Sequence, residues 1–181
     1  MDRRTALKNL ALVIGSAALL PRCTEHNPVT HFKNFDVTND QQSLVADMAE
    51  TIIPKTGTPG AKDLMLDQFV WLMLDDCTKK DDQKTFFKGM GEFNDLTKKT
   101  YNKSFADLDK KQKEDLLNTF EKKSNGYSKE LNGFFSTVKG LTVFGYTESK
   151  YFMTKEIVYE LIPGRYNAWL PVKNNIAAKN G

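Results

Sequence analysis

Helical periodicity runs through most of this chain and constrains its fold more than any other feature. Apolar residues recur three and four positions apart in several separate runs, which is the spacing of one buried helix face. The residues that carry these stripes are Leu44, Val45, Met48 and Ile52; Phe86, Phe87, Met90, Phe93 and Leu96; Leu116, Leu117 and Phe120; and Leu131, Phe134, Phe135, Val138 and Leu141. The pattern predicts an all-α fold, a single irregular helical bundle.

Capping and breaking signals divide the stripes into separate helices. The expected start signals are Thr38 with Gln41, Asp81 or Asp82, and Asp109 with Gln112, and a last short helix is expected around Ser149 to Tyr159. Pro54 ends the first helix, and residues 55–61 are expected to form a loop because they contain Gly57, Pro59 and Gly60. Gly133 and Gly140 argue against an unbroken helix between Tyr127 and Phe144.

The segment from Leu64 to Leu74 is apolar on nearly every side. Phe69, Val70, Trp71, Leu72 and Met73 are interrupted only by Asp67 and Gln68. Such a helix lies at the centre of a core or is covered by another chain.

A tail rich in aromatic, proline and glycine residues follows the last expected helix. It is expected to be extended and fixed, since its composition does not continue a helix. Two interpretations stay open: the tail packs over the bundle, or it forms a partner surface, because Arg, Tyr and Trp dominate many interfaces. The candidate partner-surface residues are Pro163, Gly164, Arg165, Tyr166 and Trp169.

The first residues are typical of an export signal. Arg3 and Arg4 precede Leu7 and Lys8, and a short apolar stretch follows, about half of the ~20 residues that a spanning helix needs. The pattern favours a twin-arginine signal, whose route carries folded proteins, over a general secretory signal. We therefore expect an export signal over residues 1–22, a linker over 23–37 and a helical domain over 38–181, with a periplasmic location.

Cys23 allows two fates for this signal. Either the signal is cleaved at the small-x-small site Ser16-Ala17-Ala18, or Cys23 becomes an acylated N-terminal cysteine that tethers the domain to a membrane surface. A membrane contact is expected only through the leader or this lipid. The formal charge of +3 comes from the leader, so the rest is near neutral and nucleic acid is not an expected partner.

The chain offers few groups for catalysis or for holding a cofactor. His26 and His31 lie in the expected linker, and Cys77 is interpreted as a small buried residue at a helix end. The pairs Asp75-Asp76 and Asp81-Asp82 are interpreted as helix caps. Gly89-Met90-Gly91 is interpreted as part of a helix and not as a dinucleotide-binding motif, because Asn94 stands where that motif has its third glycine and the flanking periodicity is helical. We expect no catalytic, cofactor-binding or metal-binding residue in this chain.

Several short strings resemble subunit 3, the small subunit, of gluconate 2-dehydrogenase. They are Ile53-Pro54, Thr58-Pro59-Gly60-Ala61, the helix with Asp67 and Phe69 ending at Asp75, Gly145-Tyr146-Thr147-Glu148, Pro163-Gly164-Arg165-Tyr166, and Pro171. The resemblance spans about Thr38 to Val172. Many relatives carry a Gly-Cys pair where this chain has Ala168-Trp169, so no role of that cysteine is carried over.

The resemblance implies a non-catalytic accessory subunit of a periplasmic dehydrogenase complex. Its partner would be a large FAD-dependent sugar or polyol dehydrogenase of the glucose–methanol–choline type, in some complexes with a cytochrome c subunit. The small subunit would hold no cofactor, carry the folded flavoprotein through the twin-arginine translocase and stabilise it. The alternative is a stand-alone exported or lipid-anchored helical module that binds a small molecule such as a sugar.

Overall fold

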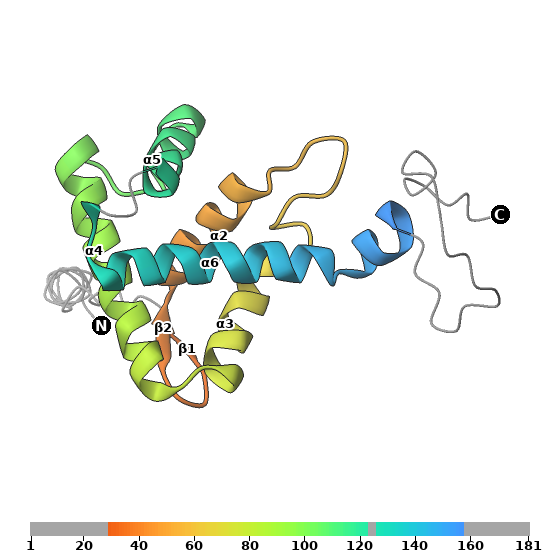
Figure 1. Ribbon diagram of the computed structural model, residues 1–181, viewed down its shortest axis with the longest axis horizontal. Helices are drawn as coiled ribbons and strands as arrows, with labels where there is room; N and C mark the ends of the chain where they lie inside the picture. The colour runs from red at the N-terminus through yellow and green to blue at the C-terminus, as the bar shows by residue number, and fades with distance from the viewer. Residues whose placement is uncertain (1–28, 123–125, 158–181) are drawn as a thin grey trace, which may run out of the picture.

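The computed structural model describes residues 29–122 and 126–157, and the fold in this part is all-α, as the periodicity predicts. Figure 1 shows α6 crossing the front of the molecule, with α4 running steeply across one end of it and α3 on one side. The elements in chain order are β1 Val29–His31, β2 Asp36–Thr38, α2 Asn39–Ile52, α3 Leu66–Cys77, α4 Lys80–Tyr101, α5 Lys110–Lys122, α6 Lys129–Thr147 and a one-turn π-helix, η2, Phe152–Glu156.

Side-chain caps begin three of these helices. Thr38 Oγ1 accepts a hydrogen bond from the Gln41 N–H at 3.3 Å, and Gln41 Oε1 accepts one from the Thr38 N–H at 2.9 Å. Asp109 and Gln112 make the same reciprocal pair before α5, at 2.8 and 3.2 Å. Ser128 Oγ accepts a hydrogen bond from a backbone N–H in the first turn of α6. Both predicted capping boxes are therefore confirmed.

The cap predicted for α4 is wrong. Lys79 occupies the N-cap position and makes no side-chain cap hydrogen bond, while Asp81 and Asp82 both lie within the first turn. Their carboxylates still stabilise the helix start, because the positive end of the helix dipole attracts them.

An antiparallel hairpin precedes α2, in the part of the expected linker that the structure describes. Val29 pairs with Thr38 and His31 with Asp36. Val37 is fully buried, and Phe32 and Phe35 lie against Trp71 of α3, each with ring centroids 6.2 Å from it. The chain from Val29 onward is thus packed on the bundle.

A cluster of aromatic rings lies in the core where α4 and α6 cross, among aliphatic side chains of α2, α3 and α5. Phe86 of α4 meets Phe134 of α6 edge to face at 4.9 Å, and Phe93 lies 5.7 Å from the same ring. Phe93 also contacts Phe105 and, on α5, Phe120. These rings bury large apolar areas and join the helices.

The helix from Lys129 to Thr147 is continuous, although Gly133 and Gly140 lie within it. Helix α6 contacts α2, α3 and α4, so tertiary packing outweighs the low helix propensity of the two glycines. The last predicted helix, from about Ser149 to Tyr159, is present as a short helix in which Lys150 and Tyr151 are α-helical and lead into the π-turn of η2, while Tyr159 lies outside the described residues. The Tyr151 hydroxyl and Glu156 form a 2.7 Å hydrogen bond there.

Candidate functional site

All site residues chosen from the sequence lie outside the described residues. These are the export-signal residues Arg3, Arg4, Leu7 and Lys8, the lipidation candidate Cys23, and the partner-surface candidates Pro163, Gly164, Arg165, Tyr166 and Trp169. They stay predictions. The described part of the chain instead offers three features to consider as a functional site: two clusters of charged residues and one apolar surface.

Asp75 forms the first charged cluster, at the carboxyl end of α3. It is 7% exposed, and its carboxylate accepts hydrogen bonds from the N–H groups of Lys33 and Asn34 at 3.0 and 2.9 Å and from the Asn34 amide. Burial by itself would raise the pKa of Asp75, but these hydrogen bonds outweigh it and hold the pKa below its ordinary value. Asp75 thus fixes the turn of the hairpin to α3.

This geometry corrects the interpretation of Asp75 and Asp76 as dipole-favoured caps. Both residues lie in the last turn of α3, where the helix dipole disfavours a negative charge. The local carbonyl groups are capped instead by the buried Gln83, whose Nε2 donates to the Leu74 oxygen at 2.9 Å and lies 3.2 Å from the Thr78 oxygen. The cluster is structural.

Asp47 of α2 forms the second cluster, with two lysines. Lys62 Nζ lies 2.6 Å from Asp47 Oδ1, and Lys113 Nζ of α5 lies 3.0 Å from Oδ2. Burial would raise the pKa of Asp47, but the hydrogen bonds and charges of the two lysines lower it. Lys113 also lies over the Phe105 ring, 5.4 Å from its centroid. Asp47 thereby ties the loop after α2 to α5.

A cleft of about 330 Å³ opens beside Asp47, between α2, the loop after it and the start of α5. Glu50, Lys55, Lys110 and Glu114 line it together with the Asp47 cluster. Glu50 accepts hydrogen bonds from the N–H groups of Lys55 and Lys62 at 3.0 and 2.9 Å. These charged groups bind one another and the backbone, and they thereby hold the loop after α2 in place along the cleft.

Gly60 shows why this loop requires a glycine. A Cβ at Gly60 would lie 2.6 Å from Glu50 Oε1 and 2.6 Å from the Lys55 backbone nitrogen. Such contacts are too short for any other residue. The Thr58-Pro59-Gly60-Ala61 string therefore serves the close approach of the loop to the end of α2.

Metal-ligating residue types are scattered in the described part of the chain. Within residues 29–122 and 126–157, no group of three or more His, Cys, Asp or Glu could hold a metal ion. His31 Nδ1 lies 2.8 Å from Asp36 Oδ1 across the exposed hairpin. Cys77 ends α3 as expected, but it is exposed and free, so its prediction as a buried residue is wrong.

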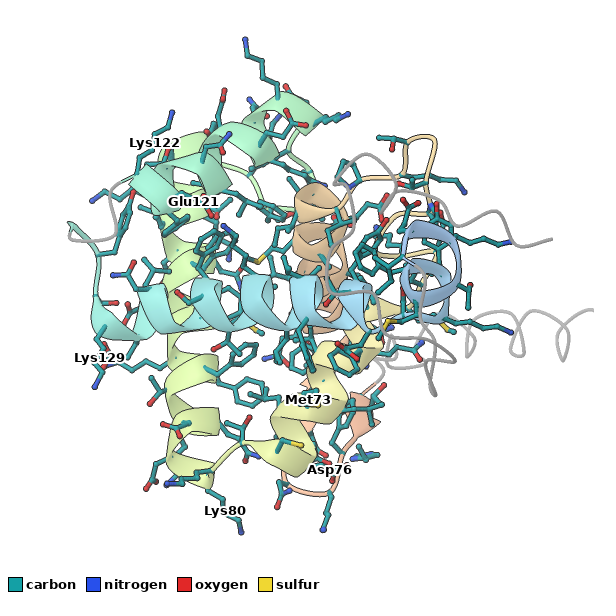
Figure 2. All side chains as sticks on the ribbon, turned by 45° about the vertical axis from the view of Figure 1, so that its right-hand side comes forward. Met73, Asp76, Lys80, Glu121, Lys122 and Lys129 are labelled. Carbon is teal, nitrogen blue, oxygen red and sulfur yellow. The ribbon has the colours of Figure 1, made fainter. Side chains whose placement is uncertain are left out.

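The third feature is an apolar surface formed by Met65, Phe69, Leu72, Val143 and Phe144, here called the α3–α6 face. Met65 is 59% exposed, Leu72 53%, Phe144 48% and Val143 42%. The Phe69 and Phe144 rings lie 6.0 Å apart and join the two helices. Figure 2 shows Met73 and Asp76 further along α3, where this helix leads away from α6. Met65, Phe69 and Leu72 are four and three residues apart and so share one side of α3, and Val143 directly precedes Phe144 on α6. Exposed apolar groups gathered in this way are typical of interaction surfaces.

Sequence reasoning found half of this surface. The apolar helix at Leu64–Leu74 was expected in the core or under another chain; α3 buries Val70 and Trp71 in the core and leaves Leu72 exposed, and its cover by another chain stays a prediction. The contribution of α6 was missed. Its sequence signal is the lack of charge, because Lys139 is the only charged residue between Leu131 and Thr147.

The described helices are each too short or too polar to cross a membrane. Neither a curated protein nor a solved structure is similar enough to this chain to count as a match. Residues 39–164, however, match the family described as gluconate 2-dehydrogenase subunit 3, and this match covers most of the chain, including α2 to η2. The chain therefore belongs to the gluconate 2-dehydrogenase subunit 3 family.

Proposed function

We propose that this chain is the accessory subunit of a periplasmic FAD-dependent sugar or polyol dehydrogenase of the glucose–methanol–choline type. In this proposal the chain itself performs no redox step. It supplies the twin-arginine signal that carries the folded flavoprotein across the membrane, and it then stabilises that subunit. The observation that carries the proposal is membership of the subunit 3 family over residues 39–164.

The leader supports the export part of the proposal. Arg3 and Arg4 precede a short apolar stretch, which is typical of a route that transports proteins after folding. A flavoprotein that binds FAD in the cytoplasm needs such a route. A partner that carries the signal would therefore also explain how the cofactor is exported.

The α3–α6 face supports the docking part of the proposal. Four of its side chains are more than 40% exposed, and an isolated small domain gains nothing from exposing them together. Burial of such groups against a second subunit is favourable by about 25 cal/mol for each Å² removed from water.

The test is to co-express the full chain with the large FAD-dependent dehydrogenase subunit of the same organism and to follow the flavin in cell fractions. Changing both Arg3 and Arg4 to Lys is expected to leave the flavin-loaded large subunit in the cytoplasm. The matched control changes Lys111, an exposed lysine on α5, to Arg and is expected to leave export unchanged.

Two outcomes would contradict the proposal. Undiminished periplasmic flavoprotein in the double variant would exclude the escort role. A wild-type chain that binds a sugar as a stable monomer and never copurifies with the flavoprotein would instead favour the stand-alone binding module.

A further inference from the structure

The outward side of α6 differs from those of the other long helices. After its first turn, which begins with the exposed Lys129, the exposed residues of α6 are Ser136, Gly140, Val143 and Phe144, and none of these four is charged. Lys139, the one charged residue between Leu131 and Thr147, is only partly exposed and pairs with Glu121 of α5. The exposed residues of α4 and α5 are mostly charged, and include Lys80, Asp81, Lys84, Asp95, Lys98, Lys99, Lys110, Lys111, Asp115 and Lys122. A solvent-facing helix surface normally carries such charges.

The neutral side of α6 also carries small residues, including the glycines Gly133 and Gly140. A Cβ built on Gly133 or on Gly140 meets no atom within 4 Å, so packing inside this chain does not require either glycine. Each glycine within a helix costs about 1 kcal/mol relative to alanine. Small residues along one side allow the backbone of a second helix to approach closely.

The neutral side of α6 continues into the α3–α6 face. Phe144 lies on both, and its ring meets Phe69 of α3 at 6.0 Å. Gly145 follows, and a Cβ there would lie 2.7 Å from the Phe69 ring, so α3 and α6 are in direct contact at this point. The contact between Phe69 and Phe144 therefore joins the exposed apolar residues of α3 to the neutral side of α6.

We infer that the α3–α6 face, with the neutral side of α6, is the surface that binds the large dehydrogenase subunit, through an uncharged apolar helix or strap of that subunit. This inference rests on the proposed function. The lack of charge supports it, because a charged partner surface would lose its hydration here and find no opposite charge among Ser136, Gly140, Val143 and Phe144.

The size of the surface fits one side of a subunit interface. The exposed apolar side chains of the α3–α6 face offer on the order of 400 Å², and each side of a standard interface buries ~800 Å² in total, of which a little over half is apolar. The face therefore supplies roughly the apolar area that one interface needs, and the contact can extend along α6 past Gly140 and Ser136.

The experiment is copurification of the full chain with the co-expressed large flavin subunit, comparing three single variants. Phe144→Asp and Gly140→Arg place a charge on the proposed interface, and Lys111→Asp places one on the charged side of α5. We expect both interface variants to reduce the copurified flavin at least tenfold and Lys111→Asp to leave it unchanged. Circular dichroism and thermal unfolding of each variant show whether the helical fold is retained.

The outcomes separate the two proposals. If wild type does not copurify with the flavin subunit, the proposed function and this inference both fail. If wild type copurifies and the folded Phe144→Asp and Gly140→Arg variants copurify equally well, only the assignment of the surface fails. A wild-type dimer in sedimentation that Phe144→Asp dissociates, with flavin binding unchanged, would identify the face as a self-association surface and also overturn the assignment.

Discussion

Gly89 of α4 lies directly against the backbone carbonyl of Glu130 at the start of α6. A Cβ built on Gly89 would overlap that carbonyl group and would lie 2.8 Å from the Phe134 Cβ. The missing side chain therefore sets the distance between the two helices whose crossing forms the aromatic core. The Gly89-Met90-Gly91 string is thus explained by packing at its first glycine.

Alanine at position 89 is expected to destabilise the protein, although alanine is the better helix former. The overlap with backbone cannot be relieved by rotating a side chain, so α4 and α6 must move apart, at a loss of about 2–3 kcal/mol. Gly91→Ala is the matched control. No atom lies within 4 Å of its Cβ position, so this variant should gain about 0.5–1 kcal/mol. Urea unfolding measures both, and a neutral Gly89→Ala variant would contradict the packing role.

The hydrogen bonds from the hairpin to Asp75 of α3 are expected to weaken in acid. The pKa of Asp75 is lowered from 3.8 in the folded protein, so the folded state binds fewer protons than the unfolded chain near that pH. The stabilisation is therefore complete above about pH 5 and is lost as the pH falls below 3.8 through the folded pKa. Melting temperatures recorded between pH 7 and pH 2.5 should show this loss.

Asp75→Asn tests the assignment to this carboxylate. The amide has one acceptor oxygen in place of two and turns its NH₂ toward the N–H groups of Lys33 and Asn34. The melting temperature at pH 7 should fall by roughly 5 °C or more, and the difference from wild type should shrink below pH 3. Asp76→Asn, at an exposed neighbour, serves as the control. An equal pH profile for Asp75→Asn and wild type would exclude Asp75 as the titrating group.

The helices were largely predictable from local sequence, because each carries a run of apolar residues and two of them, α2 and α5, begin at capping boxes formed by Thr38 and Asp109. Features that depend on distant contacts were not. The hairpin packing needs Asp75, which lies 41 positions after its partner Asn34, and the close approach at Gly89 needs Glu130. The exposed face on α6 was missed for a related reason, since exposure depends on which helices flank α6 and not on its own periodicity.

Thr142 of α6 predicts a stabilising substitution. Thr142 is fully buried, and its hydroxyl oxygen has no hydrogen-bond partner. An unsatisfied buried hydroxyl costs about 1–3 kcal/mol, and valine has nearly the same shape without it. Thr142→Val should therefore raise the free energy of unfolding by about 1 kcal/mol in urea titrations. Thr142→Ser keeps the hydroxyl and removes a methyl group, so it should lower stability by about 1 kcal/mol. A loss of stability in Thr142→Val would show that the hydroxyl is satisfied in solution.

Met65 links stability to the proposed binding surface. It precedes α3 with a φ of 53°, in the left-handed region, and it is 59% exposed. The other non-glycine residue with positive φ in the described chain is Asn102, also at 53°, and asparagine is a residue type that tolerates this conformation. Methionine at this position is therefore strained by about 1 kcal/mol, while its apolar side chain lies on the α3–α6 face.

Met65→Asn should make the isolated chain more stable by about 0.5–1 kcal/mol, because it relieves this strain and supplies a favoured cap residue before α3. The same change should weaken binding of the large flavin subunit, since it removes one apolar side chain from the interface. Asn102→Met is the converse control: it should lose about 1 kcal/mol of stability without affecting binding, because Asn102 lies at the end of α4. Urea unfolding and titration with the purified flavin subunit measure the two effects. A more stable Met65→Asn variant that binds as tightly as wild type would place Met65 outside the interface, and a less stable one would show that its backbone is unstrained.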